Sequence, residues 1–301
     1  MDYNLITILG PTATGKTRLA SQIAYQINGE IISADSRQVY RGMNIGTGKD
    51  YEDYVVNNET IPCHLIDVVD PSDEFNLFLF KNYFNKIFAE ISSRNKPPIL
   101  CGGTGLYLSS ILHNYQLNRL DPRLKEQLEQ LPVDELRSLY ISLNKKPHNT
   151  TDFIDKNRLI TSLMILKSEP ENQVTPDYIK SFNIGINLGR EEIKKRITAR
   201  LKKRLESGMI DEVKLLMSQG VSYEKMFFFG LEYKYITQHI MGELNYNDMF
   251  QKLNSAIHNF AKRQMTWFRK MEKEGIIIHW LGNNDIDRAR KLIENVGFRS
   301  S

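Results

Sequence analysis

The sequence predicts an α/β fold in which a parallel sheet is flanked by helices, together with a small all-helical insertion domain. Within residues 1–110, short apolar runs alternate with helical patterns, which is typical of parallel strands joined by helices. A complete phosphate-binding sequence follows the first apolar run. Between residues 115 and 180 the strand signals stop and helical patterns replace them. We therefore expect a catalytic core of residues 1–114 and 181–301, interrupted by a helical insertion at 115–180.

The predicted elements follow one another in a regular order. Apolar runs predict strands at residues 5–9, 30–35, 64–69, 99–101, 182–188 and 276–281. Apolar residues at helical spacing predict helices at residues 19–27 and 76–93, over most of 190–270, and after residue 281. In the insertion, helices begin at Pro122, span Val133–Leu143 and span Asp155–Lys167.

The composition describes a globular protein with enough apolar material for a full core. Of the 301 residues, 41% are hydrophobic and 25% are charged, and the net charge of +4 is mild. The two cysteines, Cys63 and Cys101, show no metal-ligand or disulfide spacing. There is no apolar stretch of membrane-spanning length and no signal-peptide pattern. We expect a cytoplasmic protein with reduced thiols.

Residues 10–17 read Gly-Pro-Thr-Ala-Thr-Gly-Lys-Thr, the G-x-x-x-x-G-K-[ST] phosphate-binding loop, between a strand signal and a helix signal. Gly10 and Gly15 allow the backbone to curl so that its N–H groups face phosphate oxygens. Lys16 supplies a point charge, and the hydroxyl of Thr17 is placed to bind Mg²⁺. This setting favours a P-loop NTPase-like sheet over an ordinary glycine-rich turn.

Two further strand ends carry polar or glycine-rich residues, and ligands of such folds bind where strands end. The carboxylate of Asp35 could accept a proton from a nucleophile, although an aspartate there is also common as a turn residue. Gly102–Gly105 permits close approach of a ligand, and Thr104 offers a hydroxyl. No apolar run ends in the aspartate of a Walker B strand, which disfavours a motor ATPase or a GTPase.

Residues 190–204 hold eight basic and two acidic residues, and Arg196, Arg200 and Arg204 run beside an apolar stripe. A solvated helix face is the commonest role of such a run, but its lopsided charge favours contact with phosphate or nucleic acid.

A second basic segment, residues 257–270, forms an apolar helical stripe that contains one polar residue, Gln264, whose buried amide would need partners. Basic residues beside Trp267 suit RNA, although this indole is more often core or rim than a stacking platform. Residues 227–229, three phenylalanines, are expected to pack in the core.

Taken in order, these pieces resemble the tRNA dimethylallyltransferase family, also called tRNA isopentenyltransferases. The matching segments lie in family order over almost the whole chain: 10–17, 32–47, 64–67, 102–107, 196–213 and 261–269. Asp-Ser-Arg-Gln-Val-Tyr at 35–40 and Lys-Arg-Gln-Met-Thr-Trp at 262–267 are far more specific than the phosphate loop.

The resemblance implies that the exocyclic amine of the adenosine 3′ of the anticodon attacks dimethylallyl diphosphate, and pyrophosphate leaves. The phosphate loop would then hold the leaving group, with Mg²⁺ as cofactor. It implies that Asp35 is the base, that Thr104 positions the adenine and that Arg200 grips the diphosphate. A flipped adenine is expected, because a stacked base could not reach Asp35. The implied partners are the tRNA anticodon stem-loop, which the insertion would contact, and dimethylallyl diphosphate. Independently of the resemblance, we expect no membrane contact and a monomer.

The implied site has three sets of residues. The catalytic set is Asp35, Thr104 and Arg200. The diphosphate-binding set, with Thr17 also as metal ligand, is Gly10, Pro11, Thr12, Ala13, Thr14, Gly15, Lys16, Thr17 and Arg196. The tRNA-binding set is Asp35, Ser36, Arg37, Gln38, Asn157, Arg158, Lys262, Arg263, Gln264, Trp267 and Arg269.

The chain departs from the family pattern in three places. In the third insertion helix, Thr161 stands where a second arginine is expected after Asn157-Arg158. The family's Ile-Gly-Tyr-Lys-Glu is Phe-Gly-Leu-Glu-Tyr at 229–233, and the alanine of its Gly-Thr-Ala-Lys is Gly48. The first two bear on substrate choice more than on chemistry.

Three alternatives stay open. A P-loop small-molecule kinase would share the phosphate loop and Asp35 but needs no basic surface. An adenine-nucleotide isopentenyltransferase would keep the chemistry and change the acceptor. An inactive RNA-binding protein would not need Lys16, Thr17, Asp35, Thr104 and Arg200 together.

Overall fold

The computed structural model describes residues 3–115, 117, 122–143, 156–167, 179–282 and 285–298. The chain forms two compact units, Met1–Asn114 with Pro176–Ser301 as the first and Tyr115–Thr175 as the second. The first unit contains the sheet and every candidate site residue outside the insertion.

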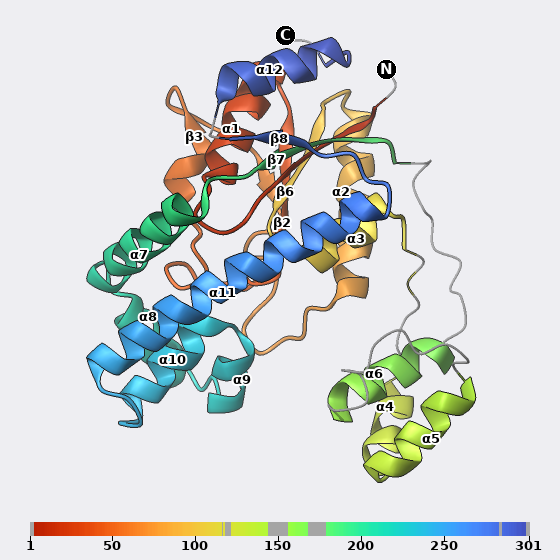
Figure 1. Ribbon diagram of the computed structural model, residues 1–301, viewed down its shortest axis with the longest axis vertical. Coiled ribbons are helices and arrows are strands. Elements are labelled where there is room, and N and C mark those ends of the chain that lie inside the picture. Colours follow the sequence, from red (N-terminus) through yellow and green to blue (C-terminus); the bar gives the residue numbers. More distant parts are fainter. Residues whose placement is uncertain are drawn as a thin grey trace. The chain divides into compact units, whose positions relative to one another are not determined.

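Six strands of the first unit form a parallel sheet in the order β5-β2-β6-β1-β7-β8 (Figure 1). Their bounds are β1 (Leu5–Leu9), β2 (Glu30–Ala34), β5 (Cys63–His64), β6 (Pro98–Gly102), β7 (Ser181–Ile186) and β8 (His279–Leu281). Every residue of β1, β2 and β6 is buried, as expected for strands covered on both faces. The predicted α/β class is confirmed.

Two predicted strands are at most half as long as expected, and a third, at 182–188, ends two residues early at Ile186. The run at 64–69 pairs only at Cys63–His64 within β5, and Leu65 and Asp67 then take positive φ angles of 63° and 54°. Extended backbone cannot continue through such residues, so the chain turns there instead. The run at 276–281 is a strand only over His279–Leu281.

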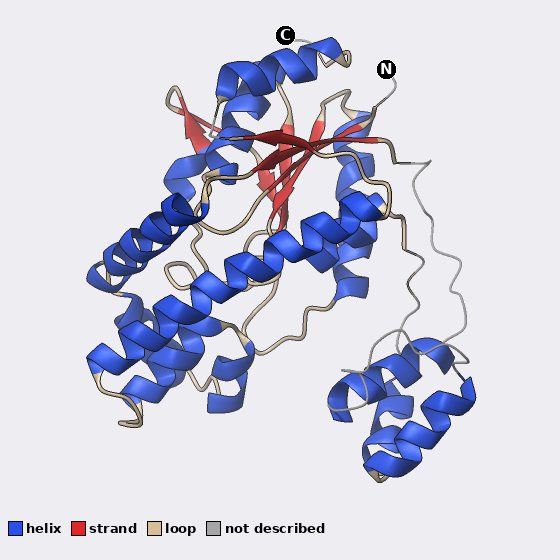
Figure 2. Cartoon of the chain, viewed as in Figure 1, coloured by secondary structure: helices blue, strands red, loops and turns tan. Residues whose placement is uncertain are grey.

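Helices cover both faces of the sheet (Figure 2). On one face α1 (Lys16–Ile27) and α12 (Ile286–Asn295) pack against alternate strand residues such as Ile6 and Ile8. On the other face, Leu5 and Leu9 join a larger core with α2 (Leu77–Ser93), α3 (Gly105–Leu112) and α11 (Tyr246–Lys273).

Four more helices extend the larger core beyond the sheet. They are α7 (Arg190–Glu206), α8 (Met209–Ser218), α9 (Tyr223–Phe228) and α10 (Leu231–Ile240). The segment after β2 adds a 3-10 turn, η1 (Tyr51–Tyr54), and a small hairpin of β3 (Val55–Val56) and β4 (Glu59–Thr60).

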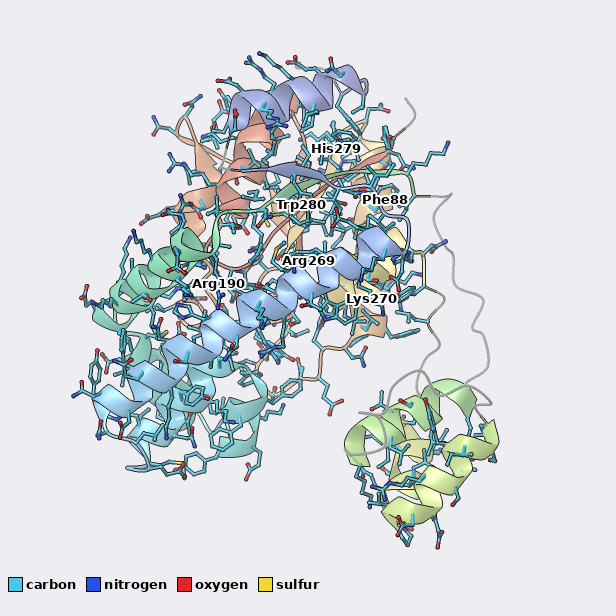
Figure 3. All side chains as sticks on the ribbon, in the orientation of Figure 1. Phe88, Arg190, Arg269, Lys270, His279 and Trp280 are labelled. Atoms are coloured by element: carbon cyan, nitrogen blue, oxygen red, sulfur yellow. The ribbon has the colours of Figure 1, made fainter. Side chains whose placement is uncertain are left out.

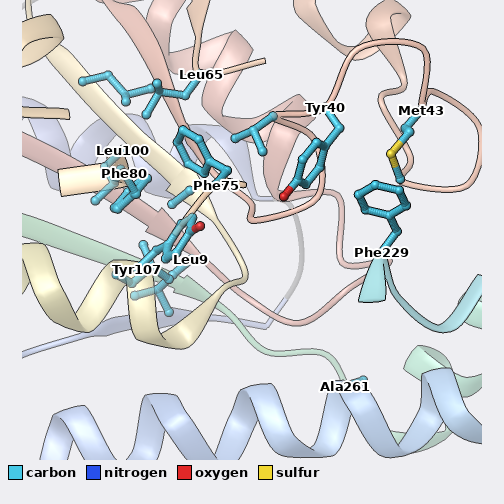
Figure 4. Close-up of a cluster of buried hydrophobic side chains, with 14 of the residues drawn as sticks. Leu9, Tyr40, Met43, Leu65, Phe75, Phe80, Leu100, Tyr107, Phe229 and Ala261 are labelled. Atoms are coloured by element: carbon cyan, nitrogen blue, oxygen red, sulfur yellow. The ribbon is translucent and has the colours of Figure 1, made fainter. Parts of the chain in front are cut away.

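Aromatic contacts join the sheet side of this core to its helical extension (Figure 4). The rings of Phe80 and Tyr107 stack at 4.0 Å, and Tyr40 meets Phe229 edge-on at 4.9 Å. Phe229 is buried, but Phe227 and Phe228 are 40% and 56% exposed. The expectation that all three phenylalanines pack was therefore wrong for two of them, because the short helix α9 turns only one face to the core.

The second unit contains α4 (Pro122–Glu129), α5 (Val133–Leu143) and α6 (Lys156–Lys167). These helices share a separate apolar cluster that includes Leu136, Tyr140 and Leu163. Asp155, expected to begin the third helix, lies outside the described residues. Among the helices that the structure describes, none is both long and apolar enough to cross a bilayer.

Candidate active site

The phosphate loop connects β1 to α1 and has the curled backbone that its glycines allow. Gly15 caps α1 with φ of 80°, and Ala13 also lies in the left-handed region at 62°. The Thr14 hydroxyl donates to the carbonyl oxygen of Pro11 at 2.8 Å, which closes the loop on itself. At Gly10, a Cβ would lie only 3.0 Å from the carbonyl oxygen of Ile186, so a side chain there would press against β7.

Lys16 begins α1 and lies over the loop, where its Nζ is 3.4 Å from the carbonyl oxygen of Pro11. Burial lowers the pKa of Lys16, while the negative charge of Asp35 acts in the opposite direction. A lysine in such surroundings gains from a bound anion, because the anion offsets its desolvation. Thr17 follows in the first turn of the helix, half-buried.

Asp35 and Thr104 lie beside each other at the ends of β2 and β6. The Thr104 hydroxyl accepts a hydrogen bond from the backbone N–H of Ser36 at 3.1 Å. The Asp35 carboxylate accepts one from the backbone N–H of Arg37 at 2.9 Å. Asp35 is therefore a turn residue, and the same bond fixes the orientation of its carboxylate.

Gln264 of α11 connects the phosphate loop to the glycine-rich turn. Its side-chain oxygen accepts from the backbone N–H of Thr12 at 2.9 Å, and its side-chain nitrogen donates to the carbonyl oxygen of Gly103 at 2.8 Å. The side chain is only 5% exposed, so both bonds satisfy groups that water does not reach. The predicted need of this amide for partners is confirmed.

Trp267, one turn further along α11, covers the start of α3. A Cβ at Gly105 would lie 2.5 Å from Cγ of the indole, so this glycine is what lets the ring lie against the helix backbone. Lys270 lies over the other part of the ring, with its Nζ at 5.3 Å from the ring centroid. Trp267 is half-buried, at the rim of the site rather than free on its surface.

Arg200 of α7 reaches the phosphate loop and Arg196 does not. The Arg200 guanidinium is 3.5 Å from the Thr12 hydroxyl and pairs with Asp50 at 2.5 Å. Arg196 instead donates to Glu192 at 2.6 Å on the outer surface of the same helix. The structure thus brings one of the two predicted diphosphate arginines to the loop.

The predicted tRNA-contacting residues divide into three groups. Gln38 bonds to the carbonyl oxygen of Gly48 at 3.0 Å, and the Arg37 guanidinium lies 4.8 Å above the Phe228 ring. Three residues are exposed on α11, where Figure 3 labels one of them: Lys262, Arg263 and Arg269. Asn157 and Arg158 belong to α6, in the second unit, and their side chains are outside the described part of the chain.

Glu212 of α8 is a site-supporting residue that the sequence analysis did not single out. Its carboxylate accepts three backbone hydrogen bonds, from Asn44, Ile45 and Gly46, at 2.8, 2.7 and 2.9 Å. It also accepts one from the Tyr233 hydroxyl at 2.7 Å. Glu212 lies within the matched segment 196–213 and binds the matched loop at 32–47, but no pattern within either segment marks this carboxylate as the partner of the loop.

Comparison with known proteins agrees with this geometry. The family model described as IPP transferase matches residues 38–271, and the one described as isopentenyl transferase matches residues 3–65. A protein of Trichlorobacter lovleyi named tRNA dimethylallyltransferase 2 is 48% identical, over 96% of this chain and 96% of that protein.

Solved structures agree as well. The tRNA isopentenylpyrophosphate transferase of Bacillus halodurans superposes with a TM-score of 0.70 at 32% identity, over 97% of this chain and 95% of the other. A eukaryotic dimethylallyltransferase, described as acting on tRNA, gives a TM-score of 0.76 over 98% of this chain and 80% of that one. At 23% identity, this second likeness supports the fold alone.

Proposed function

This chain belongs to the IPP transferase family of tRNA dimethylallyltransferases, and we propose that it transfers the dimethylallyl group of dimethylallyl diphosphate to tRNA. The acceptor is the exocyclic amine of the adenosine 3′ of the anticodon. The amine nitrogen bonds to the first carbon of the dimethylallyl group, the bond from that carbon to oxygen breaks, and pyrophosphate leaves with its electron pair.

One observation carries this proposal: a line of hydrogen bonds joins the phosphate loop to the candidate base. Gln264 bonds both Thr12 and Gly103, and the adjoining Thr104 accepts from Ser36, next to Asp35. A diphosphate held by the loop would therefore have its reactive carbon near both Thr104 and Asp35. Such fixed geometry is what a displacement between two bound substrates requires.

The leaving group would be stabilised by positive charge at the loop. Lys16, the loop N–H groups and the Arg200 guanidinium would all face oxygens on which negative charge grows as the bond breaks. Diphosphate oxygens and the Thr17 hydroxyl would hold Mg²⁺, which adds positive charge at the leaving oxygen. Thr17, in the first turn of α1, offers one hydroxyl oxygen, so the diphosphate would have to supply further oxygen ligands.

The proton of the attacking amine would pass to Asp35. Its carboxylate is already oriented by the Arg37 N–H, so the remaining acceptor capacity can point at the substrate. Thr104 would position the adenine through its hydroxyl. The adenine must leave its stack to reach this place, and the exposed cations of α11, such as Arg263, would hold the RNA backbone while it does so.

The test compares three reactions of the purified protein with Mg²⁺. Two contain dimethylallyl diphosphate, one with unmodified tRNA and the other with AMP as acceptor. The third contains ATP in place of the diphosphate and no acceptor. Nucleosides are then identified by mass spectrometry. Dimethylallyladenosine in tRNA alone is the expected result. Prenylated AMP would move the acceptor to a free nucleotide, and ATP consumption without prenyl transfer would indicate a kinase.

A further inference from the structure

Two departures from the family pattern meet at one side chain, Arg204 of α7. Gly48 takes the place of the family's alanine, and a Cβ there would lie 1.7 Å from Nη2 of Arg204. Glu232 takes the place of the family's lysine, and its charge acts directly on Arg204. Glu232 thus replaces a family cation with an anion, and Arg204 supplies a cation nearby.

Gly48 is the residue that makes room for this cation. It has φ of 71°, and a Cβ would also lie 2.7 Å from Nη2 of Arg200, so both guanidinium groups occupy the space of a missing methyl group. An alanine at this position would be strained by its backbone angle. It would also push the end of the arginine side chain away from the loop.

Arg204 is buried, and two of its guanidinium nitrogens lack hydrogen-bond acceptors among the described residues. Its side chain is 12% exposed, and its Nε and Nη2 have no hydrogen-bond partner within the part of the chain that the structure describes. Burial, together with the positive charge of the neighbouring Arg200, lowers the pKa of Arg204 to about 10. Buried guanidinium donors without partners are costly, and a multivalent anion would satisfy them.

Asp50 is a counter-ion that the two arginines share, and Glu232 also attracts Arg204. Asp50 lies 2.5 Å from Nη2 of Arg200 and 3.9 Å from Nη2 of Arg204. Its side chain is 47% exposed, so it can return to water at small cost. Arg200 also reaches Thr12, and both arginines act electrostatically on Lys16. The pair therefore borders the phosphate loop.

We propose that Arg204 is a second guanidinium ligand of the donor's diphosphate, and that the diphosphate displaces Asp50 from the Arg200–Arg204 pair. This inference rests on the proposed function, because it takes the diphosphate to lie in the phosphate loop. A diphosphate offers more oxygens and more charge than one carboxylate, so the exchange favours binding. Gly48 then determines whether the Arg204 guanidinium has room beside the phosphate loop.

The alternative is a purely structural arginine that neutralises Glu232. Ligand-induced stabilisation separates the two roles. A structural arginine would lower the melting temperature of the free protein when removed, but would leave the further rise caused by pyrophosphate intact. Removal of an arginine that binds the diphosphate would make that rise smaller.

The experiment titrates inorganic pyrophosphate into the protein with Mg²⁺ present, by calorimetry, without RNA. We expect Arg204→Met to bind about tenfold to a hundredfold more weakly, as loss of a charged hydrogen-bonding group does. Lys203→Met is the matched control, because Lys203 is an exposed neighbour on the same helix, and its pyrophosphate affinity should equal that of the wild type. Equal affinity for Arg204→Met and the wild type would overturn the inference.

Two further variants guard against a misfolded Arg204→Met protein. Asp50→Asn should bind pyrophosphate several-fold more tightly, since the internal competitor is gone; weaker binding would contradict the displacement. Gly48→Ala should weaken binding more in the wild type than in Arg204→Met, because the two changes share the Arg204 contact while the contact of the new Cβ with Arg200 remains in both. A wild type that binds pyrophosphate but makes no prenylated RNA would refute the proposed function and leave this inference standing.

Discussion

The side-chain oxygen of Gln264 accepts a hydrogen bond from the backbone N–H of Thr12 at 2.9 Å, across 252 residues of sequence. Because the same amide also bonds the carbonyl oxygen of Gly103, helix α11 holds the phosphate loop and the glycine-rich turn at a fixed spacing. This contact connects α11 to the phosphate loop, so a displacement of the helix would also shift the loop.

Replacement of Gln264 by leucine should destabilise the protein and weaken pyrophosphate binding. The change leaves a buried N–H and a buried carbonyl unpaired, and we expect the free energy of unfolding to fall by about 2–4 kcal/mol in urea titrations. Gln251→Leu, on an exposed position of the same helix, should change it by less than about 0.5 kcal/mol. Equal stability of the two variants would show that the bridge contributes little.

Glu212→Gln should loosen the loop at 44–46. A carboxamide presents an N–H₂ group to a site built from three backbone donors and the Tyr233 hydroxyl, so one donor loses its acceptor. We expect a loss of about 1–3 kcal/mol in unfolding free energy and a raised KM for dimethylallyl diphosphate. Asp211→Asn, an exposed neighbour, is the control, and behaviour identical to this control would argue against the clamp.

Arg263→Ala should weaken the binding of every tRNA to a similar extent. It should also reduce the slope of log affinity against log salt concentration by about 1, as the loss of one phosphate contact does. Arg263 is exposed on α11 and lines an open groove of about 530 Å³ together with Tyr235. Arg290→Ala, whose cation is already paired with acidic neighbours on α12, should leave the slope unchanged. An unaltered slope for Arg263→Ala would assign that side chain a structural role.

Stability at acidic pH should depend on Glu30. Burial raises the pKa of this carboxyl, but hydrogen bonds from His64, Lys96 and Arg94 outweigh it, and the net pKa lies below the ordinary 4.5. The contribution to stability is therefore complete above about pH 4.5 and is lost as the pH falls through the lowered pKa.

Urea titrations between pH 3 and 7 would measure this effect. Glu30→Gln should lower the unfolding free energy by about 2 kcal/mol at pH 7 and flatten its decline below about pH 4.5. Glu90→Gln provides a control, since Glu90 is exposed and its pairing with Lys86 at 4.0 Å is weak. An equally steep decline in the Glu30→Gln variant would locate the acid sensitivity elsewhere.

The sequence predicted features that depend on neighbours along the chain. Local periodicity and the placement of glycines predicted the phosphate loop, the helix Val133–Leu143 and the strands β1 and β2. The polar Gln264 within an apolar stripe even predicted that a buried amide needed partners.

Contacts between distant segments could not be predicted in the same way. The identity of the Gln264 partners, the Glu212 clamp and the approach of Arg204 to Gly48 depend on how helices pack after the chain folds. An acidic residue in an amphipathic helix looks the same whether it faces water or three backbone N–H groups. Likewise, helical periodicity alone does not separate Arg196 from Arg200, but only Arg200 reaches the phosphate loop.

The most direct test of the account compares the wild type with Asp35→Ala in one assay. Each protein receives Mg²⁺, dimethylallyl diphosphate and unmodified tRNA, and dimethylallyladenosine is quantified by mass spectrometry beside pyrophosphate affinity. We predict product with the wild type and a rate lower by about 10² to 10⁴ with Asp35→Ala, at retained pyrophosphate affinity. Product formed at the wild-type rate by Asp35→Ala, or none formed by either protein, would contradict the account.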